Sequence, residues 1–167
     1  MKAVILAAGL GSRLQNMLNG KPKPLLKVNN KNMIEYSLEA LSTTKIKDVH
    51  IVIGYKGEMI KEEIGNEFKG LKINYCENKS YQSTGSMHSL FCAFKDPEDC
   101  LVLDGDIIYD YRVLHELIEN KEKNMVVLGN CGARGDEVFV ELKNNKVVYL
   151  SKKKPEGSSV FEFTGIS

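Results

Sequence analysis

The sequence predicts an α/β protein built on a mostly parallel, doubly wound sheet, with an antiparallel hairpin late in the chain. Short apolar runs without alternation, such as residues 3–8 and 100–103, are typical of strands buried on both faces of a parallel sheet. Segments whose apolar residues recur every three or four positions lie between these runs, as crossover helices would. Strands that alternate with helices in this way form a parallel sheet covered by helices.

The predicted elements follow one another without an internal repeat. Strands are expected at residues 3–8, 49–53, 71–75, 100–103 and 125–128, and helices at residues 33–41, 59–68, 84–94 and 113–121. Thr84 carries a hydroxyl group that can cap the third of these helices. The segments 138–142 and 147–150 flank Asn144 and Asn145, which favour turns, and together they predict the hairpin.

The composition is that of an ordinary globular domain, with 43% hydrophobic and 27% charged residues in a chain of 167. A net charge of +1 gives no electrostatic reason to expect a nucleic acid or an anionic membrane as partner. The apolar start is interrupted at Gly9 and Arg13, too early for a signal peptide. We therefore expect a cytoplasmic protein. The cysteines are far apart and are expected to be reduced thiols without a metal or redox role: Cys76, Cys92, Cys100 and Cys131.

A glycine-broken loop follows the first predicted strand and would lie at the carboxyl edge of the sheet, where α/β proteins bind ligands. Gly9 and Gly11 remove side chains, so that backbone N–H groups, including that of Ser12, can approach phosphate oxygens. Arg13 adds a planar charged group that matches phosphate geometry. Leu14 stands where a dinucleotide fingerprint needs a third glycine, and no Gly-Lys-Ser/Thr follows. The pattern predicts phosphate binding, and a purely structural turn is the alternative.

Downstream of this loop, Lys21 and Lys23 alternate with Pro22 and Pro24. The two prolines restrict the backbone, so the ammonium groups are expected to be held close to the glycine loop.

A pair of aspartates, Asp104 and Asp106, flanks a glycine at the end of the predicted strand 100–103. Mg²⁺ prefers a few carboxylate and phosphate oxygens and keeps several waters, so this edge is a candidate magnesium site. The alternative is a strand-ending turn, in which Asp-Gly is common.

These segments resemble the signature of the nucleotidyltransferase (NDP-sugar pyrophosphorylase-like) superfamily, and most of all its choline-phosphate cytidylyltransferase-like bacterial branch. The segments that carry the resemblance are residues 6–14, 23–28, 32–36, 53–57, 78–81, 86–90 and 103–108. The resemblance implies a Rossmann-like, glycosyltransferase-A-like nucleotidyltransferase fold over residues 1–167 as one domain. It also implies a Mg²⁺-dependent reaction that couples a nucleoside triphosphate to a small phosphorylated acceptor and releases pyrophosphate.

The same resemblance suggests roles for the residues at the first motif. The backbone from Leu6 through Ala7 and Ala8 to the glycine loop is expected to bind the nucleotide. Lys23 is the candidate for the α-phosphate, and Arg13 and the loop amides are the candidates for the β- and γ-phosphates. Asp106 is the favoured metal ligand and Asp104 the second candidate.

Base recognition is assigned to residues 82–89. Gly85 would let a base approach the backbone, while Gln82, Ser86 and Ser89 supply hydrogen-bonding groups. The resemblance favours cytosine, and therefore CTP. The alternative is a loop and helix cap with no ligand, and His88 is either a packed residue or a ligand contact.

The acceptor site is the least defined part of the prediction. Lys154 lies in a segment similar to the acceptor-phosphate lysine motif of the superfamily, and Lys152 or Lys153 are alternatives within the same run. A choline-type cation would contact aromatic faces or carboxylates, for which Tyr109 and Glu162 are candidates. An amino-acid-derived phosphate or a phosphonate also fits, whereas the proline-containing motif of many sugar nucleotidyltransferases is absent from the stretch around Gly85.

The sequence departs from the superfamily at its end, because Ser167 follows a strand-like segment after which the superfamily supplies a second metal-binding aspartate. We expect a truncated domain or a partner chain that completes the site. Edge strands between Val138 and Leu150 would favour a homodimer. Two other classes stay open: a nucleotide-binding domain without turnover, and a sugar-phosphate or molybdopterin nucleotidyltransferase on the same scaffold.

Overall fold

The computed structural model describes residues 1–11, 18–94, 98–120, 122, 124–132, 135, 137–155 and 160–167. The chain divides into two compact units, an N-terminal unit of residues 1–121 and a C-terminal unit of residues 122–167. Each unit is described by itself. The single domain expected over residues 1–167 stays a prediction.

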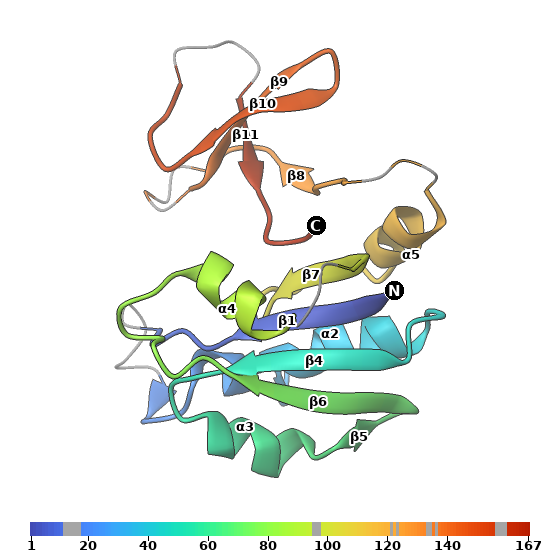
Figure 1. Ribbon diagram of the computed structural model, residues 1–167, viewed down its shortest axis with the longest axis vertical. Coiled ribbons are helices and arrows are strands. Elements are labelled where there is room, and N and C mark those ends of the chain that lie inside the picture. The colour runs from blue at the N-terminus through green and yellow to red at the C-terminus, as the bar shows by residue number, and fades with distance from the viewer. Residues whose placement is uncertain are drawn as a thin grey trace. The chain divides into compact units, whose positions relative to one another are not determined.

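A five-stranded sheet forms the centre of the N-terminal unit (Figure 1). Its strands are β1 (Lys2–Ala7), β4 (Asp48–Ile53), β5 (Glu67–Phe68), β6 (Leu71–Glu77) and β7 (Cys100–Asp104). They lie in the order β5-β6-β4-β1-β7. The pairs β1–β4, β1–β7 and β4–β6 are parallel, and β5 pairs with β6 antiparallel. This arrangement confirms the predicted mostly parallel sheet.

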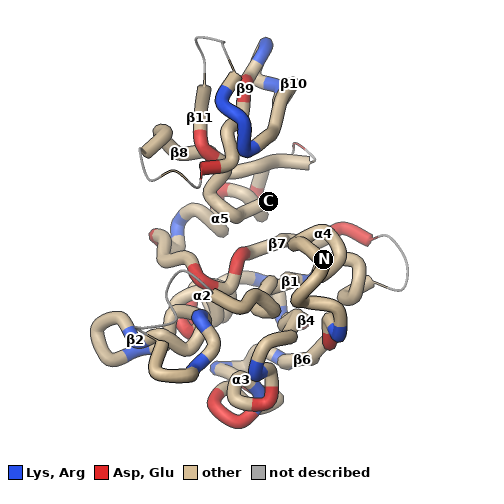
Figure 2. The backbone as a smooth tube through the Cα atoms, turned by 90° about the vertical axis from the view of Figure 1, so that its left-hand side faces the viewer, with Lys and Arg blue, Asp and Glu red and all other residues tan. Residues whose placement is uncertain are grey.

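In the part of the N-terminal unit that the structure describes, four α-helices and one short 3₁₀ helix accompany these strands. They are η2 (Lys23–Leu25), α2 (Met33–Ser42), α3 (Gly57–Ile64), α4 (Ser86–Cys92) and α5 (Arg112–Glu119). Helix α2 follows the small ladder of β2 (Lys27–Val28) and β3 (Lys31–Asn32) and begins with a capping box, in which the backbone N–H of Asn32 donates to Glu35 at 2.8 Å. Residues of both charges lie along α3 (Figure 2). None of the described helices is long and apolar enough to cross a membrane.

The core of the N-terminal unit lies on both faces of the sheet, because successive side chains of a strand point to opposite sides. On one face Val4 and Val52 pack with Ala93, which follows α4. Ile5, on the opposite face of β1, is fully buried, as is Leu38 of α2. Helix α4 lies in front of the sheet and α2 behind it in Figure 1, so helices cover both faces as predicted.

The C-terminal unit contains a four-stranded antiparallel sheet in the order β10-β9-β11-β8. Its strands are β8 (Leu128–Gly129), β9 (Phe139–Lys143), β10 (Lys146–Ser151) and β11 (Val160–Phe163). Strands β9 and β10 are the predicted hairpin, and Asn144 and Asn145 form its turn with φ of 52° and 57°. Two successive positive φ angles are those of a type I′ turn, which matches the twist of a hairpin.

Three predicted elements differ clearly from the structure in their bounds, and for the two helices the reason is local. The helix expected at 59–68 ends at Ile64, because Gly65 follows with φ of 73°, and β5 begins at residue 67. The helix expected at 84–94 begins at Ser86, since the Thr84 hydroxyl donates to the Ser80 carbonyl at 2.8 Å instead of capping α4. Of the strand expected at residues 125–128, only the last residue, Leu128, lies in a strand of the structure, β8.

Candidate functional site

The carboxyl ends of β1 and β7 meet at one edge of the parallel sheet. Leu6 is paired with Asp104, and the backbone N–H of Gly105 donates to the Leu6 carbonyl at 2.9 Å. A Cβ atom on Gly105 would lie 2.8 Å from that carbonyl oxygen, so only glycine lets the chain leave β7 this close to β1. Asp104 and Asp106 are therefore positioned where the glycine loop leaves β1.

The charge of Asp106 influences the pKa of Asp104. Burial, and then the charge of Asp106, raise the pKa of Asp104 to about 6, while the charge of Lys23 acts in the opposite direction. The Lys23 Nζ forms an ion pair with the Asp106 carboxylate, and both side chains are about 30% exposed, at 29% and 31%. The edge thus holds an excess of negative charge that Lys23 partly offsets.

Lys23 is held in place by the turn that follows the loop. It is the first residue of η2, between the buried Pro22 and Pro24. The turn is closed by a hydrogen bond from the Leu26 N–H to the Lys23 carbonyl at 3.0 Å. A Cβ atom on Gly11, which has φ of +61°, would lie 3.3 Å from Lys23 Cβ, so the loop backbone passes beside this lysine. The structure thereby brings Gly11, Lys23 and Asp106 together.

The other residues at the end of β1 and in the glycine loop differ in their exposure to solvent. Ala7 and Ala8 are buried and Leu6 is half-buried, whereas Gly9 is exposed, with open space where a Cβ would be. The Ala8 carbonyl accepts from the Tyr55 N–H at 3.1 Å, which fixes the start of the loop against the end of β4. The predicted phosphate ligands Ser12 and Arg13 lie outside the described residues.

The acidic pair fits a magnesium ion by its chemistry. Asp106 and Asp104 supply hard carboxylate oxygens at one edge of the sheet. Over the described ranges, no three His, Cys, Asp or Glu side chains form a metal-binding group. Mg²⁺ commonly uses one or two carboxylates with phosphate oxygens and water, so two aspartates are enough for this type of site.

The segment assigned to base recognition places three of its four candidates at the surface. Gln82, Gly85 and Ser86 are exposed, and a Cβ on Gly85 would contact nothing within 4 Å. Ser89 is buried, and its hydroxyl oxygen accepts from the Asn78 side chain at 2.9 Å. Asn78 lies in one of the segments that carry the family resemblance, but the sequence predicted no role for it.

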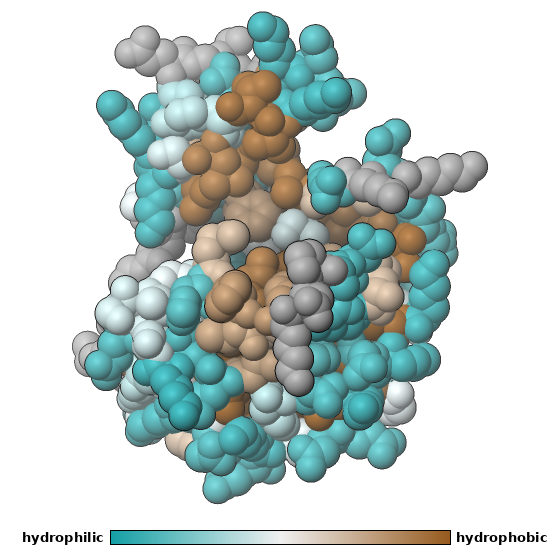
Figure 3. Space-filling view, in the orientation of Figure 1, coloured by the Kyte–Doolittle hydropathy of each residue, from teal (hydrophilic) through white to brown (hydrophobic). Residues whose placement is uncertain are grey.

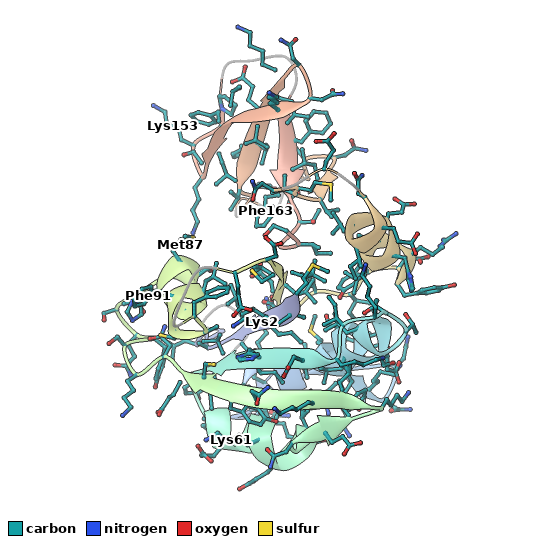
Figure 4. The ribbon with its side chains drawn as sticks, turned by 45° about the vertical axis from the view of Figure 1, so that its right-hand side comes forward. Lys2, Lys61, Met87, Phe91, Lys153 and Phe163 are labelled. Atoms are coloured by element: carbon teal, nitrogen blue, oxygen red, sulfur yellow. The ribbon has the colours of Figure 1, made fainter. Side chains whose placement is uncertain are left out.

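Helix α4 has an inner and an outer face. Ser89 and Ala93, one turn apart, face the core of the unit. Met87 and Phe91 lie on the other side of the helix and are 77% and 72% exposed. Their side chains project away from the sheet in Figure 4, and Figure 3 shows apolar surface in this part of the N-terminal unit.

The acceptor candidates belong to both units. Tyr109 is in the N-terminal unit. Its hydroxyl group is buried near Ser37 and has no hydrogen-bond partner among the described residues, and burial raises its pKa to about 12. Lys154 is an exposed residue that follows β10 in the C-terminal unit. Glu162 is part of β11, and its carboxylate accepts from the Gly132 N–H at 3.2 Å.

Comparison with known proteins identifies the same scaffold. Residues 3–148 match the family described as the MobA-like NTP transferase domain. A CTP:phosphoglutamine cytidylyltransferase from Campylobacter jejuni is 28% identical over 170 residues, which cover 92% of this chain and 66% of the relative. A D-glycero-alpha-D-manno-heptose 1-phosphate guanylyltransferase from the same organism is 38% identical over 110 residues, covering 66% of this chain and 49% of the relative. The chain thus spans less than two thirds of the length of each.

Two solved structures have the same fold. One, from Bacillus anthracis and provisionally assigned as a glucose-1-phosphate thymidylyltransferase, has a TM-score of 0.82 at 27% identity and covers 99% of this chain and 70% of that one. The other, CTP:phosphocholine cytidylyltransferase from Streptococcus pneumoniae, has a TM-score of 0.66 at 26% identity, with coverage of 99% and 68%. Together with the family match, these comparisons show that the chain belongs to the family of MobA-like NTP transferase domains.

Proposed function

We propose that this protein is a Mg²⁺-dependent nucleotidyltransferase that transfers CMP from CTP to a small phosphorylated or phosphonate acceptor and releases pyrophosphate. The observation that carries the proposal is the convergence of Gly11, Lys23 and Asp106 at the edge between β1 and β7. A backbone free of side chains, an ammonium group and a carboxylate for a cation are the parts that triphosphate binding requires.

The chemistry is an in-line displacement. An oxygen of the acceptor attacks the α-phosphorus, the bond from that phosphorus to the bridging oxygen breaks, and pyrophosphate leaves with the electron pair. Such a reaction depends on positioning and charge stabilisation and needs no side-chain nucleophile. In this proposal Lys23 stabilises the charge on the α-phosphate. Arg13 and the amides of Gly9, Gly11 and Ser12 bind the β- and γ-phosphates.

The aspartates hold the cation in this proposal. Asp106 is the main ligand, and Asp104, whose pKa is raised by burial and by Asp106, is the second. When bound, Mg²⁺ supplies positive charge to the triphosphate and to the departing pyrophosphate. Lys23 contacts Asp106 in the structure, and with a cation on the Asp106 carboxylate its ammonium group would be available to the α-phosphate.

CTP is the proposed nucleotide because two of the similar proteins described above are cytidylyltransferases. The exposed Gln82, Gly85 and Ser86 offer hydrogen-bonding groups and open backbone for a base. For the acceptor, Lys154 is the proposed phosphate contact, with Tyr109 and Glu162 as further candidates. The acceptor class follows the cytidylyltransferase relatives, whose names give phosphoglutamine and phosphocholine.

A sugar-1-phosphate nucleotidyltransferase is the second candidate function. It is favoured by the 38% identity to the heptose 1-phosphate guanylyltransferase and by the TM-score of 0.82 to the Bacillus anthracis structure. The two candidates use the same triphosphate chemistry and differ in base and acceptor. Substrate choice therefore separates them.

The test is pyrophosphate release with Mg²⁺ from CTP, UTP, dTTP, ATP and GTP. Each is paired with phosphocholine, an amino-acid-derived phosphate, an aminoalkylphosphonate and a set of sugar 1-phosphates. We expect turnover with CTP and a non-sugar acceptor. Asp106→Asn and Lys23→Met should each lower kcat at least 100-fold, because each removes charge that stabilises the transition state. Lys27→Met, at an exposed lysine of β2, is the matched control and should keep wild-type activity.

Turnover confined to GTP or dTTP with a sugar 1-phosphate would replace the cytidylyltransferase assignment with the second candidate. Nucleotide binding without pyrophosphate release from any pair would contradict the enzymatic proposal and indicate a nucleotide-binding domain.

A further inference from the structure

We propose that Asn78 is a positioning residue that determines base selection by holding the segment 80–86 in a single conformation. The inference rests on the proposed nucleotidyltransferase function and adds to it a residue that does not contact the base. Asn78 directly follows β6 at the carboxyl edge of the sheet and is only 1% exposed. Burial of a polar side chain destabilises the folded state unless its hydrogen-bonding groups have partners.

The Asn78 side chain makes three hydrogen bonds. Its amide nitrogen donates to Ser89 Oγ at 2.9 Å and to Thr84 Oγ1 at 3.1 Å. Its Oδ1 atom accepts from the Ser80 N–H at 3.0 Å. Both amide hydrogens are thus used, and the three hydrogen bonds together connect the start of the segment at Ser80 with Thr84 and with helix α4.

The segment itself is closed by short-range hydrogen bonds that depend on this centre. Thr84 Oγ1 donates to the Ser80 carbonyl at 2.8 Å while it accepts from Asn78. The Ser83 N–H donates to the same carbonyl at 3.0 Å. Residues 80–84 therefore form a compact turn around the Asn78 amide, and the exposed Gln82 lies within it.

The turn is also attached to the neighbouring strand. The Asn78 N–H donates to the Ile53 carbonyl at the end of β4 at 2.9 Å. A Cβ atom on Gly54 would lie 2.8 Å from Tyr81 Cβ, so the turn contacts the chain as it leaves β4. Two strand ends and one helix consequently fix the position of the exposed groups of Gln82, Gly85 and Ser86.

Ser89 has a different part in this arrangement from the one expected from sequence. Its hydroxyl group is directed into the N-terminal unit and binds Asn78, so we assign it to anchoring α4. The candidates left for direct contact with the base are Gln82, Gly85 and Ser86, which are exposed.

The predicted consequence is a change in selectivity more than in rate. The segment 80–89 contains no Lys, Arg, Asp or Glu, so it contributes no formal charge to the triphosphate or the cation. Discrimination between bases depends on hydrogen-bonding groups held at fixed positions, because a misplaced group no longer rejects the wrong base edge. Loosening the turn should therefore raise KM and weaken discrimination while kcat changes little.

The test is the ratio of kcat/KM for the preferred nucleotide to that for the second-best nucleotide. Asn78→Ala should lower this ratio about tenfold and raise KM, with kcat within about threefold of wild type. The ratio is measured on one preparation and does not depend on the fraction of folded enzyme. Asn74→Ala is the matched control. Asn74 is an asparagine within β6, its side chain donates to Asp48 at 2.9 Å, and its loss should leave the ratio unchanged.

Thr84→Val and Ser89→Ala each remove one acceptor of the Asn78 amide and should lower the ratio by smaller factors. If Asn78→Ala does not fold, the same ratio of kcat/KM values, measured on these two variants, tests the positioning role of Asn78. An unchanged ratio in these variants, with active wild-type enzyme, would overturn the positioning role alone. Wild-type protein that neither binds nor turns over any nucleotide would instead overturn the proposed function.

Discussion

At the scale of single residues, Lys23 and Asp106 carry opposite charges that offset each other at the candidate site. The ion pair between them joins the segment after the glycine loop to the end of β7. Lys23 is the proposed phosphate contact, and Asp106 is the proposed metal ligand. The two proposed roles therefore belong to side chains that also contact each other.

Replacing Lys23 by methionine should strengthen cation binding while it weakens catalysis. The substitution removes the positive charge next to Asp106, so Mn²⁺ titrated in the absence of nucleotide should bind severalfold more tightly, as followed by electron paramagnetic resonance. Lys27→Met is again the matched control and should not change Mn²⁺ affinity. Weaker Mn²⁺ binding by Lys23→Met would contradict the competition between lysine and cation.

We expect the titration of His50 to make the free energy of unfolding depend on pH. This residue of β4 is half-buried, its Nδ1 lies 3.7 Å from Cys76 Sγ, and burial, followed by the charge of Lys2, lowers its pKa. The nearby carboxylates of Asp48 and Glu98 act against this shift, and Lys72 adds to it. Because the unfolded state takes up the proton more readily, the free energy of unfolding should fall as the pH drops below the ordinary histidine pKa of 6.5.

The measurement is urea unfolding between pH 8 and pH 5. His50→Gln should flatten the decrease below pH 6.5, and comparison at pH 8, where the wild-type imidazole is neutral, gives the baseline. An equal decrease in both proteins would show that other groups cause the acid sensitivity.

At the scale of elements, the site depends on how closely the strand ends approach one another. Gly54, directly after β4, lies against the Ala8 carbonyl and Tyr81. Gly105, directly after β7, lies against the Leu6 carbonyl. In both places the neighbouring atoms would be 2.8 Å from an added Cβ. Small residues after strands thus set the spacing between the glycine loop, the aspartates and the base segment.

Gly54→Ala should displace the start of the glycine loop and the turn at Tyr81. We expect a loss of about 1–3 kcal/mol in the free energy of unfolding, as is usual for overpacking, together with weaker nucleotide binding. Gly129→Ala in β8 is the control, because its Cβ would lie 3.4 Å from Thr164 Cγ2, an ordinary contact. Unfolding in denaturant and nucleotide titration measure the two effects, and equal stability losses in both variants would contradict the close approach at Gly54.

The element boundaries show where local sequence signals compete. The hairpin was predictable because Asn144 and Asn145 tolerate the positive φ angles that its turn requires. The start of α4 was predicted wrongly because Thr84 can cap a helix or close a turn, and the structure uses it for the turn around Asn78. Whether Thr84 caps the helix or closes the turn depends on the Asn78 side chain, which lies outside the helix.

At the scale of the whole molecule, the buried apolar residues are unevenly divided between the two units. Among the described residues that form the buried core, Val140 and Ile166 belong to the C-terminal unit and all others to the N-terminal unit. The C-terminal unit also carries exposed Val147, Val148 and Leu150 on β10, an edge strand of its sheet. The homodimer expected from such an edge stays a prediction.

This division predicts different local stabilities. Amides of β1 and β4 should exchange with deuterium most slowly, and amides of β9 and β10 should be among the fastest of the described strands, because fewer buried contacts oppose local opening there. Hydrogen exchange of the intact protein measures both sets in one experiment. Equal protection of the two sheets would contradict the inference from burial.

The sequence by itself determined the main strands and helices, the hairpin and the two motifs, because apolar periodicity, glycines and prolines act over a few residues. Only the tertiary structure decided that Lys23 contacts Asp106, that Ser89 faces Asn78 and that the Tyr109 hydroxyl is buried near Ser37. Each of these contacts joins side chains from different segments of the chain. For Lys23 and Asp106, the contact depends on the pairing of β1 with β7, which are far apart in the sequence, and local sequence patterns do not encode such a pairing.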